Sequence, residues 1–254
     1  MKKFPKITVY IVNRNYGKYI RQALESVISQ TYENIELIVI DDNSTDNSKV
    51  LIKAFKKKYK KTIILFNKKK IGLIKNINIA IKKSKGKYII RLDSDDYLHP
   101  KAVEKMYLKI KKDKNIGLVF PNFYWINNNG KILSEFKYNY KLNYLIKYIP
   151  AHGACSLINK KILKKIGGYN ELFDRQDGYY IWFLILLNNF KIFHIKKALF
   201  FYRKHNRSLS NNIYKILKTR IKILNYLINN FLYFNLELFR HKKNTLQKLK
   251  LNRL

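Results

Sequence analysis

Short apolar runs alternate with amphipathic segments along the first part of the chain. Residues 7–12, 35–40, 62–66 and 88–92 are rich in Ile, Val and Leu and end at polar residues, which is typical of strands buried on both faces. The segments between them carry helical spacing or helix start signals, over residues 20–30, from a cap at Ser44 or Thr45 to about 58, and from Gly72 to about 86. This β-α-β-α-β-α-β order predicts an α/β fold with a mostly parallel sheet flanked by helices.

The pattern is less regular after residue 100. We expect a helix from Pro100 to about 112, strands over 117–124, 154–158 and 192–202, and helices over 160–166 and 179–187. Residues 127–149 are rich in Asn, Lys and Tyr and give no clear assignment. Beyond Asn212 apolar residues recur at mixed helical spacing among many lysines, without Gly or Pro. The chain is therefore expected to have one domain over residues 1–212 and a basic, amphipathic helical tail over 213–254.

Length and composition narrow the setting. A chain of 254 residues with 47% hydrophobic residues can bury one sizeable core. Its one cysteine, Cys155, excludes an internal disulfide and favours a reducing compartment. The start of the chain has no apolar signal region, and no apolar run approaches the ~20 residues of a spanning helix. These features predict a cytoplasmic protein, soluble or peripheral on the inner face of the cell membrane.

The net charge of +37 changes this picture less than its size suggests. The basic residues are 44 Lys and 9 Arg, spread along the whole chain, and Ile and Asn are abundant with them. Lys, Ile and Asn that are abundant together indicate a compositional drift of the whole proteome. Selection for nucleic-acid binding would instead favour Arg, which is the better residue for phosphate and base recognition and is scarce here. We expect no nucleic acid partner. The positive surface should nevertheless attract anionic lipid head groups.

The carboxylates are far from evenly distributed. Nine of the 16 acidic residues fall in three short segments, which are Asp41, Asp42 and Asp46; Asp93, Asp95 and Asp96; and Glu171, Asp174 and Asp177. The first two segments follow predicted parallel strands, where ligands bind in open α/β sheets. Turn and helix-cap chemistry would explain either one alone. Three carboxylates within four residues repel one another, however, and a hard cation such as Mg²⁺ or Mn²⁺ relieves that repulsion.

Five segments of the sequence resemble glycosyltransferase family 2, which has the GT-A fold, over roughly residues 5–210. The matching segments stand in family order and spacing, at residues 7–20, 26–46, 85–96 with the Asp-x-Asp motif, 175–182 and 202–210. The resemblance implies an inverting enzyme that moves a sugar from a nucleotide-diphosphate sugar, UDP-linked by expectation, to a hydroxyl of a glycan or lipid-linked acceptor. It also implies Mg²⁺ or Mn²⁺, a hexosyl- or N-acetylhexosaminyl-transferase, and a place in surface polysaccharide biosynthesis.

The resemblance also implies roles for individual residues. Asp177 is the expected general base, Asp95 the expected metal ligand, and Asp93 is expected to reach the ribose or the metal. The Asp42 carboxylate is expected to accept from a ring N–H of a uracil-like base. The remaining residues expected to bind the nucleotide-sugar are Val12, Asn13, Arg14, Lys75, Ser94 and Arg203.

Some positions depart from the family pattern or allow two interpretations. Many members have Ala-Arg-Asn where this chain has Asn76-Ile77-Asn78, so Lys75 is the candidate for the missing positive charge. His205 is a phosphate or metal contact, or a solvated loop residue. Trp182 is expected in the core, Cys155 in a buried structural position, and His152 on the acceptor side.

Two other functions and two interpretations of the tail stay open at this point. A nucleotidyltransferase would need a Gly-rich phosphate loop after the first strand, and Asn13-Arg14-Asn15-Tyr16-Gly17 stands there instead. A non-catalytic relative would bind nucleotide or lipid, but the retained carboxylates argue against it. The tail either lies on an anionic bilayer through its apolar face or packs on the catalytic domain with its lysines solvated.

Overall fold

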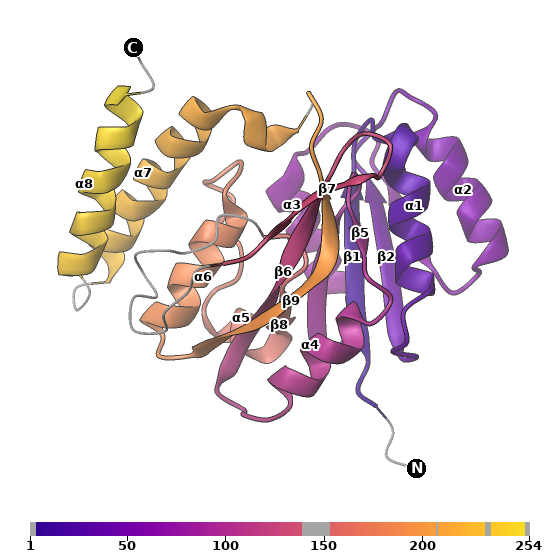
Figure 1. Cartoon of the computed structure of the whole chain (residues 1–254), viewed down its shortest axis with the longest axis horizontal. Coiled ribbons are helices and arrows are strands. Elements are labelled where there is room, and N and C mark those ends of the chain that lie inside the picture. The colour runs from indigo at the N-terminus through magenta and orange to yellow at the C-terminus, as the bar shows by residue number, and fades with distance from the viewer. Residues whose placement is uncertain (1–3, 139–152, 207, 232–234, 252–254) are drawn as a thin grey trace.

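The computed structural model describes residues 4–138, 153–206, 208–231 and 235–251 (Figure 1). Its first half alternates strands and helices as the sequence predicts. The elements are β1 (Ile7–Asn13), α1 (Gly17–Ile28), β2 (Ile35–Asp41), α2 (Ser48–Lys58), β3 (Ile63–Phe66), α3 (Leu73–Lys83) and β4 (Tyr88–Asp93). The four strands are parallel, in the order β3-β2-β1-β4.

The second half adds a mixed extension to this sheet. Its elements are β5 (Tyr97–Leu98), α4 (Ala102–Ile110), β6 (Ile116–Ile126), β7 (Ile132–Phe136), β8 (Leu157–Asn159), α5 (Lys160–Lys165), α6 (Asp177–Leu187), β9 (Lys191–Arg203), α7 (Ile213–Asn230) and α8 (Asn235–Leu251). The sheet continues as β4-β8-β6-β9-β5, with β7 paired to β6. Strand β8 is antiparallel to β4 and β6, whereas β6 and β9 are parallel. The predicted α/β class is therefore confirmed.

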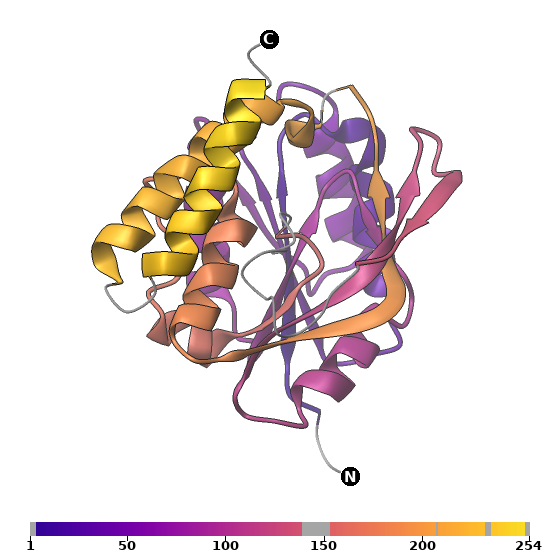
Figure 2. The same cartoon turned by 60° about the vertical axis from the view of Figure 1, so that its left-hand side comes forward.

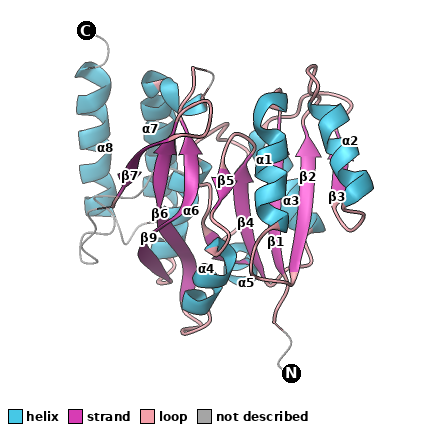
Figure 3. Ribbon diagram, turned by 45° about the vertical axis from the view of Figure 1, so that its right-hand side comes forward, coloured by secondary structure: helices cyan, strands magenta, loops and turns pink. Residues whose placement is uncertain are grey.

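Two apolar cores cover the two faces of the sheet. On β1, Tyr10 belongs to the core under α3, α5, α6 and α7, whereas Val9 and Ile11 belong to the core under α1, α2 and α4. This alternation is the period of two that a strand buried on both faces produces. Trp182 is 1% exposed and packs against Phe120, which confirms its predicted place in the core. Figure 3 shows the two helical layers on either side of the sheet.

The tail forms two helices that lie side by side (Figure 2). Helix α7 buries Leu217, Ile223, Leu224 and Leu227, and the last three join the core that also contains α6. Helices α7 and α8 lie at the end of the molecule opposite α2 (Figure 1). Among the described residues no helix is both long enough and apolar enough to cross a membrane.

One local prediction needs correction, and two short strands were not predicted. Helix α2 begins at Ser48, so neither Ser44 nor Thr45 caps it, because the Ser44 hydroxyl instead donates to Asp41 Oδ2 at 2.6 Å. Strand β7 lies in the segment without an assignment, and its five residues are all exposed, so it lacks the buried positions that reveal a strand. The two-residue strand β5 pairs with β9 and is too short to leave a pattern.

Candidate active site

The predicted site residues gather at the carboxyl ends of β1, β2 and β4. Strand β1 lies between the other two, and its register pairs Val12 with Ile40 on one side and with Asp93 on the other. Loops that leave adjacent parallel strands at the same edge of a sheet lie close together. The loop that contains Asp42 and the loop that contains Asp95 therefore border one site.

The end of β1 is fixed to the loop after β2. Asn13 is fully buried, and its Nδ2 donates to Asp41 Oδ2 at 2.8 Å and to the Ser44 hydroxyl at 3.2 Å. Arg14 Nη1 donates to the carbonyl oxygens of Asp42, at 2.7 Å, and Asn43. Within the described residues no donor reaches Asn13 Oδ1, although this oxygen is buried. The wall of the site thus contains a rigid polar network with one acceptor left over.

The Asp42 carboxylate is almost saturated by donors from this chain. Its Oδ1 accepts from Asn67 Nδ2 at 2.9 Å and from the Ile71 N–H at 2.8 Å, and its Oδ2 accepts from the Gly72 N–H at 2.9 Å. Burial pushes the pKa of Asp42 up, but these donors outweigh burial and hold it below its usual value. The Asn76 side chain adds a further hydrogen bond that lowers the pKa of Asp42, so the roughly four acceptor sites of this carboxylate are largely used within the chain.

The Asp-x-Asp loop follows β4 and contains three carboxylates in different environments. Burial raises the pKa of Asp93 to about 6, against the opposing effect of the Arg91 guanidinium. Burial also raises the pKa of Asp96, whose Oδ1 accepts the Arg203 N–H at 2.8 Å. Asp95 pairs with His205, which lines the pocket described below. Ser94 between them is 2% exposed.

Asp177 is joined to this loop through Arg91, a residue that the sequence analysis did not single out. Asp177 is the first residue of α6 and is 6% exposed, and its Oδ2 is paired with Arg91 Nη1. Arg91 Nε lies 2.9 Å from Asp93 Oδ1. The signal was present, because Arg91 is the one charged residue inside the apolar run 88–92 and a buried charge needs partners.

The other acids of the third segment lie in different surroundings. Asp174 is 77% exposed, and Glu171 is exposed and accepts from Asn78 Nδ2 at 3.0 Å. The main chain also closes around Asp177, since a Cβ at Gly153 would lie 2.6 Å from Asp177 Oδ2 and 3.3 Å from Arg91 Cζ. The structure therefore joins Asp177, alone of the three, to the Asp-x-Asp loop.

Arg203 supports the Asp-x-Asp loop from behind. It is 2% exposed, and its Nε donates to the Asp95 carbonyl oxygen at 2.8 Å. Its Nη1 donates to the carbonyls of Asn127 and Asn128, and its Nη2 donates to Gln22 Oε1. Four of the five N–H groups of a guanidinium are thus engaged within the chain. In this conformation Arg203 fixes the backbone of the predicted metal ligand, and one N–H is left for a phosphate.

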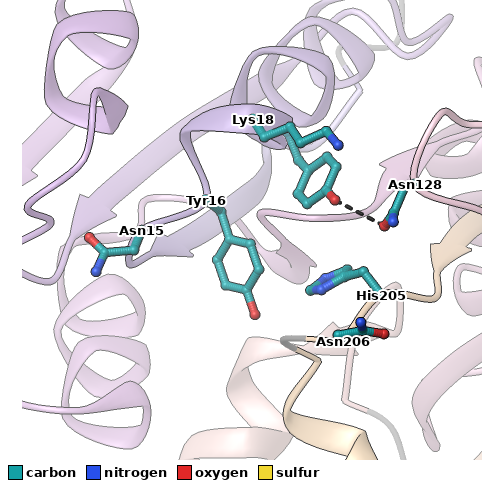
Figure 4. A pocket seen from close by; sticks show the side chains of 7 residues that line it. Asn15, Tyr16, Lys18, Asn128, His205 and Asn206 are labelled. Atoms are coloured by element: carbon teal, nitrogen blue, oxygen red, sulfur yellow. Dashed lines mark hydrogen bonds between the residues drawn. The ribbon is translucent and has the colours of Figure 1, made fainter.

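A cleft of about 340 Å³ lies beside Asp95, and Figure 4 shows the side chains that line it. They are Asn15, Tyr16, Lys18, Tyr19, Asn128, His205 and Asn206. His205 Nε2 lies 2.9 Å from Asp95 Oδ2, and the Tyr16 and Tyr19 rings pack against the imidazole. The His205 side chain is only 5% exposed and lies beside Asp95, so it is not the solvated side chain of one of the two interpretations.

No three His, Cys, Asp or Glu side chains of the described residues lie close enough to form a complete metal site. The donor set nevertheless suits a metal that the nucleotide completes. Mg²⁺ is usually held by one or two carboxylates together with substrate phosphates and waters, and Asp95 with His205 beside it offers such a partial shell. Asp93 contributes less freely, because both of its oxygens face Arg91.

The remaining residues that the sequence singles out lie on α3, just before β8, or outside the residues that the structure describes. Lys75 is exposed in the first turn of α3. Among the described residues no hydrogen bond or ion pair joins it to the carboxylates of the site. Ile77, where many family members have Arg, is fully buried in the apolar core, and Asn76 before it is buried and accepts from Asn67 Nδ2 at 2.8 Å. Cys155 is buried as predicted, with φ at 51°. His152 lies outside the described residues.

Comparisons of sequence identify the family. Residues 8–167 match the sequence model of the family described as "Glycosyl transferase family 2". An uncharacterized glycosyltransferase of Methanocaldococcus jannaschii, MJ1057, is 32% identical over 225 residues, which cover 85% of this chain and 76% of that protein. The Escherichia coli enzyme UDP-Glc:alpha-D-GlcNAc-diphosphoundecaprenol beta-1,3-glucosyltransferase WfgD is 29% identical over 88% of this chain and 87% of its own length.

Two solved structures share the fold. TarS 1-349 of S. aureus in complex with UDP-GlcNAc superposes with a TM-score of 0.73 and 19% identity, covering 96% of this chain and 71% of that one. The mannosyltransferase PcManGT of Pyrobaculum calidifontis, in complex with GDP-Man and Mn²⁺, gives a TM-score of 0.71 and 13% identity over 95% and 70%. At these identities the likeness shows the GT-A fold alone. The family match over most of the chain and the similarity to MJ1057 establish that this protein is a glycosyltransferase that belongs to glycosyl transferase family 2.

Proposed function

We propose that the protein transfers a hexose or an N-acetylhexosamine from a UDP-sugar, with inversion, to a hydroxyl of a glycan or lipid-linked acceptor in surface polysaccharide synthesis. The observation that carries the proposal is the buried Asp177 carboxylate, held through Arg91 beside Asp93 of the Asp-x-Asp loop. The UDP-linked donor and the lipid-linked acceptor of WfgD support the choice of substrates.

In the proposed complex the nucleotide lies across the ends of β1 and β2. Val12, Asn13, Arg14 and Asp42 line its base, with the Asp42 carboxylate as the proposed acceptor from a ring N–H. Asp93 and Ser94 border the ribose and the diphosphate. Lys75 and Arg203 are the proposed phosphate contacts, Lys75 from the exposed start of α3 and Arg203 through its one remaining N–H.

The chemistry follows from the position of Asp177. As the acceptor oxygen bonds to the anomeric carbon, the bond from that carbon to the diphosphate oxygen breaks, and its electron pair leaves with the nucleoside diphosphate. The acceptor proton passes to Asp177 as general base. One base without a carboxylate nucleophile gives inversion. A divalent metal held by Asp95, with Asp93 and His205 near it, would supply Lewis-acid stabilisation of the leaving diphosphate.

Metal-dependent donor binding is the direct test of this proposal. We expect UDP-glucose or UDP-N-acetylglucosamine to raise the melting temperature in the presence of Mn²⁺, and Asp95→Ala to abolish that stabilisation, because its carboxylate is the proposed metal ligand and pairs with His205 at the cleft. The measurement is a thermal-shift series over both donors and GDP-mannose, followed by assay of the nucleoside diphosphate released. Asp113→Ala is the matched control, since Asp113 pairs with Lys191 outside the site. An unchanged Mn²⁺ dependence in Asp95→Ala would refute the metal assignment.

We further propose that the enzyme works at an anionic membrane surface, to which the tail contributes charge. The apolar face of α7 packs against the rest of the protein and is not available to a bilayer. The proposed attraction to the membrane therefore comes from exposed lysines, which include Lys215, Lys218 and Lys222. Each basic residue near such a surface adds about 1 kcal/mol, and the sum falls with salt.

Co-sedimentation with vesicles tests this attraction. We expect binding to vesicles that contain phosphatidylserine, little binding to phosphatidylcholine alone, and release by salt. Reversal of Lys215, Lys218 and Lys222 to Glu should weaken binding, whereas the same reversal of Lys53, Lys57 and Lys58 on α2, at the opposite end of the molecule, should weaken it less. Binding that ignores lipid charge, or equal losses in the two triple variants, would contradict a membrane-facing tail.

A further inference from the structure

Arg91 is placed where a positive charge is expensive. It lies in the middle of β4, and its side chain is 7% exposed, between two sheet neighbours and below the Asp-x-Asp loop. A guanidinium removed from water is tolerated only when anionic partners and hydrogen bonds compensate for its lost hydration. Here the partners are Asp177 and Asp93, two carboxylates that the proposed reaction uses.

The contacts on Asp177 are one-sided. Arg91 Nη1 pairs with Oδ2, and the main chain at Gly153 passes against the same oxygen. Within the described part of the chain no group donates a hydrogen bond to Asp177 Oδ1. One oxygen is therefore fixed by charge and by packing, and the other is left to accept a proton.

The same guanidinium also fixes the donor side. Its Nε lies 2.9 Å from Asp93 Oδ1 and its Nη2 donates to Asp93 Oδ2 at 3.3 Å, while Nη1 faces Asp177. Only a planar fork with donors on several edges can hold two carboxylates in fixed relative positions, and the ammonium group of Lys cannot.

We propose that Arg91 is a positioning residue that orients the catalytic base against the Asp-x-Asp loop, so that Oδ1 of Asp177 receives the acceptor proton. This inference rests on the proposed function. In the reaction the acceptor O–H bond breaks, its proton goes to Oδ1, and Oδ2 stays paired with Arg91. A base that is misaligned by about 1 Å loses much of its effect, which is why the orienting contact matters.

The test is a double-substitution cycle on turnover. The probe is UDP release from UDP-glucose or UDP-N-acetylglucosamine with Mn²⁺, with water as acceptor. We expect Arg91→Lys to lower kcat by roughly 10- to 100-fold, as loss of an orienting contact does. In the Asp177→Asn background the same change should cost no more than about 2-fold, because Arg91 then has no base to orient. Arg21→Lys, an exposed arginine paired with Glu25 on α1, is the matched control and should leave kcat unchanged.

Each outcome has a distinct meaning. Equal losses from Arg91→Lys in both backgrounds would overturn the inference, because Arg91 would then act independently of Asp177. A wild-type protein that releases no nucleoside diphosphate from any donor would refute the proposed function instead. In that case the melting temperatures of Arg91→Met, Asp177→Asn and the double variant decide on the pairing. If the losses of melting temperature in the two single variants add up in the double variant, the Arg91–Asp177 pairing is contradicted. If the double variant melts no lower than Arg91→Met, the pairing is supported.

Discussion

Asp177→Asn is expected to keep donor binding and to lower turnover by ~10² to 10⁴, the usual contribution of a general base. The change preserves the shape of the side chain, and the amide oxygen can still accept from Arg91, so the fold should survive. What is lost is the basicity needed to take the acceptor proton. The measurement is kcat from nucleoside diphosphate release, together with the donor Kd from titration calorimetry.

Asp174→Asn is the matched control for this prediction. Asp174 is three residues away, but its side chain is 77% exposed, and its Oδ1 lies 3.6 Å from Arg175 Nε. Its substitution should leave both kcat and Kd within experimental error. Near wild-type turnover in Asp177→Asn, or a comparable loss in Asp174→Asn, would show that Asp177 is a structural acid.

Removal of residues 213–254 is expected to abolish the folded state as well as activity. Four buried apolar side chains of α7 are lost, at about 1.5 to 3 kcal/mol each, which sums to about 6 to 12 kcal/mol as an upper estimate. The whole free energy of unfolding of a domain is about 5 to 15 kcal/mol. The truncation also removes Arg220, whose Nε donates to Gln176 Oε1 at 2.8 Å, directly before Asp177. Circular dichroism and thermal melting provide the measurement.

Two point substitutions in the tail serve as matched controls. Leu224 is fully buried in the core shared with α6, and Leu224→Ala should cost about 2 to 5 kcal/mol. Leu246 on α8 is 38% exposed, and Leu246→Ala should stay within about 0.5 kcal/mol of wild type. A truncated protein that melts like the full chain would show instead that the predicted division at residue 212 separates an independent tail.

The elements and the loop positions were readable from the sequence because their signals are local. Strands β2 and β4 are buried on both faces, so their ends could be placed to within a residue, and with them Asp42 after β2 and Asp95 after β4. Helix α6 was predicted from residue 179, two residues after its observed start. Its cap is Gln176 in a left-handed conformation, which gives no standard capping signal.

What the sequence did not reveal depends on long-range pairing. Arg91 and Asp177 are 86 positions apart, and nothing in either local pattern states that they meet. The donors to Asp42 come from Asn67, Ile71 and Gly72, in a turn that had no assigned function. The tail showed the same ambiguity, because an apolar helix face looks alike whether it meets a bilayer or another helix.

The main chain at Gly153 bears on the side from which the acceptor proton reaches Asp177 in the proposed active site. Because it lies against the Oδ2 side of Asp177, where Arg91 is also paired, the proposed mechanism has the proton arrive at Oδ1, on the side where the acceptor would bind. Water and acceptor must then compete for the same place. An acceptor that fills this place would shield the activated sugar from hydrolysis, so occupancy of the acceptor position would itself conserve the donor.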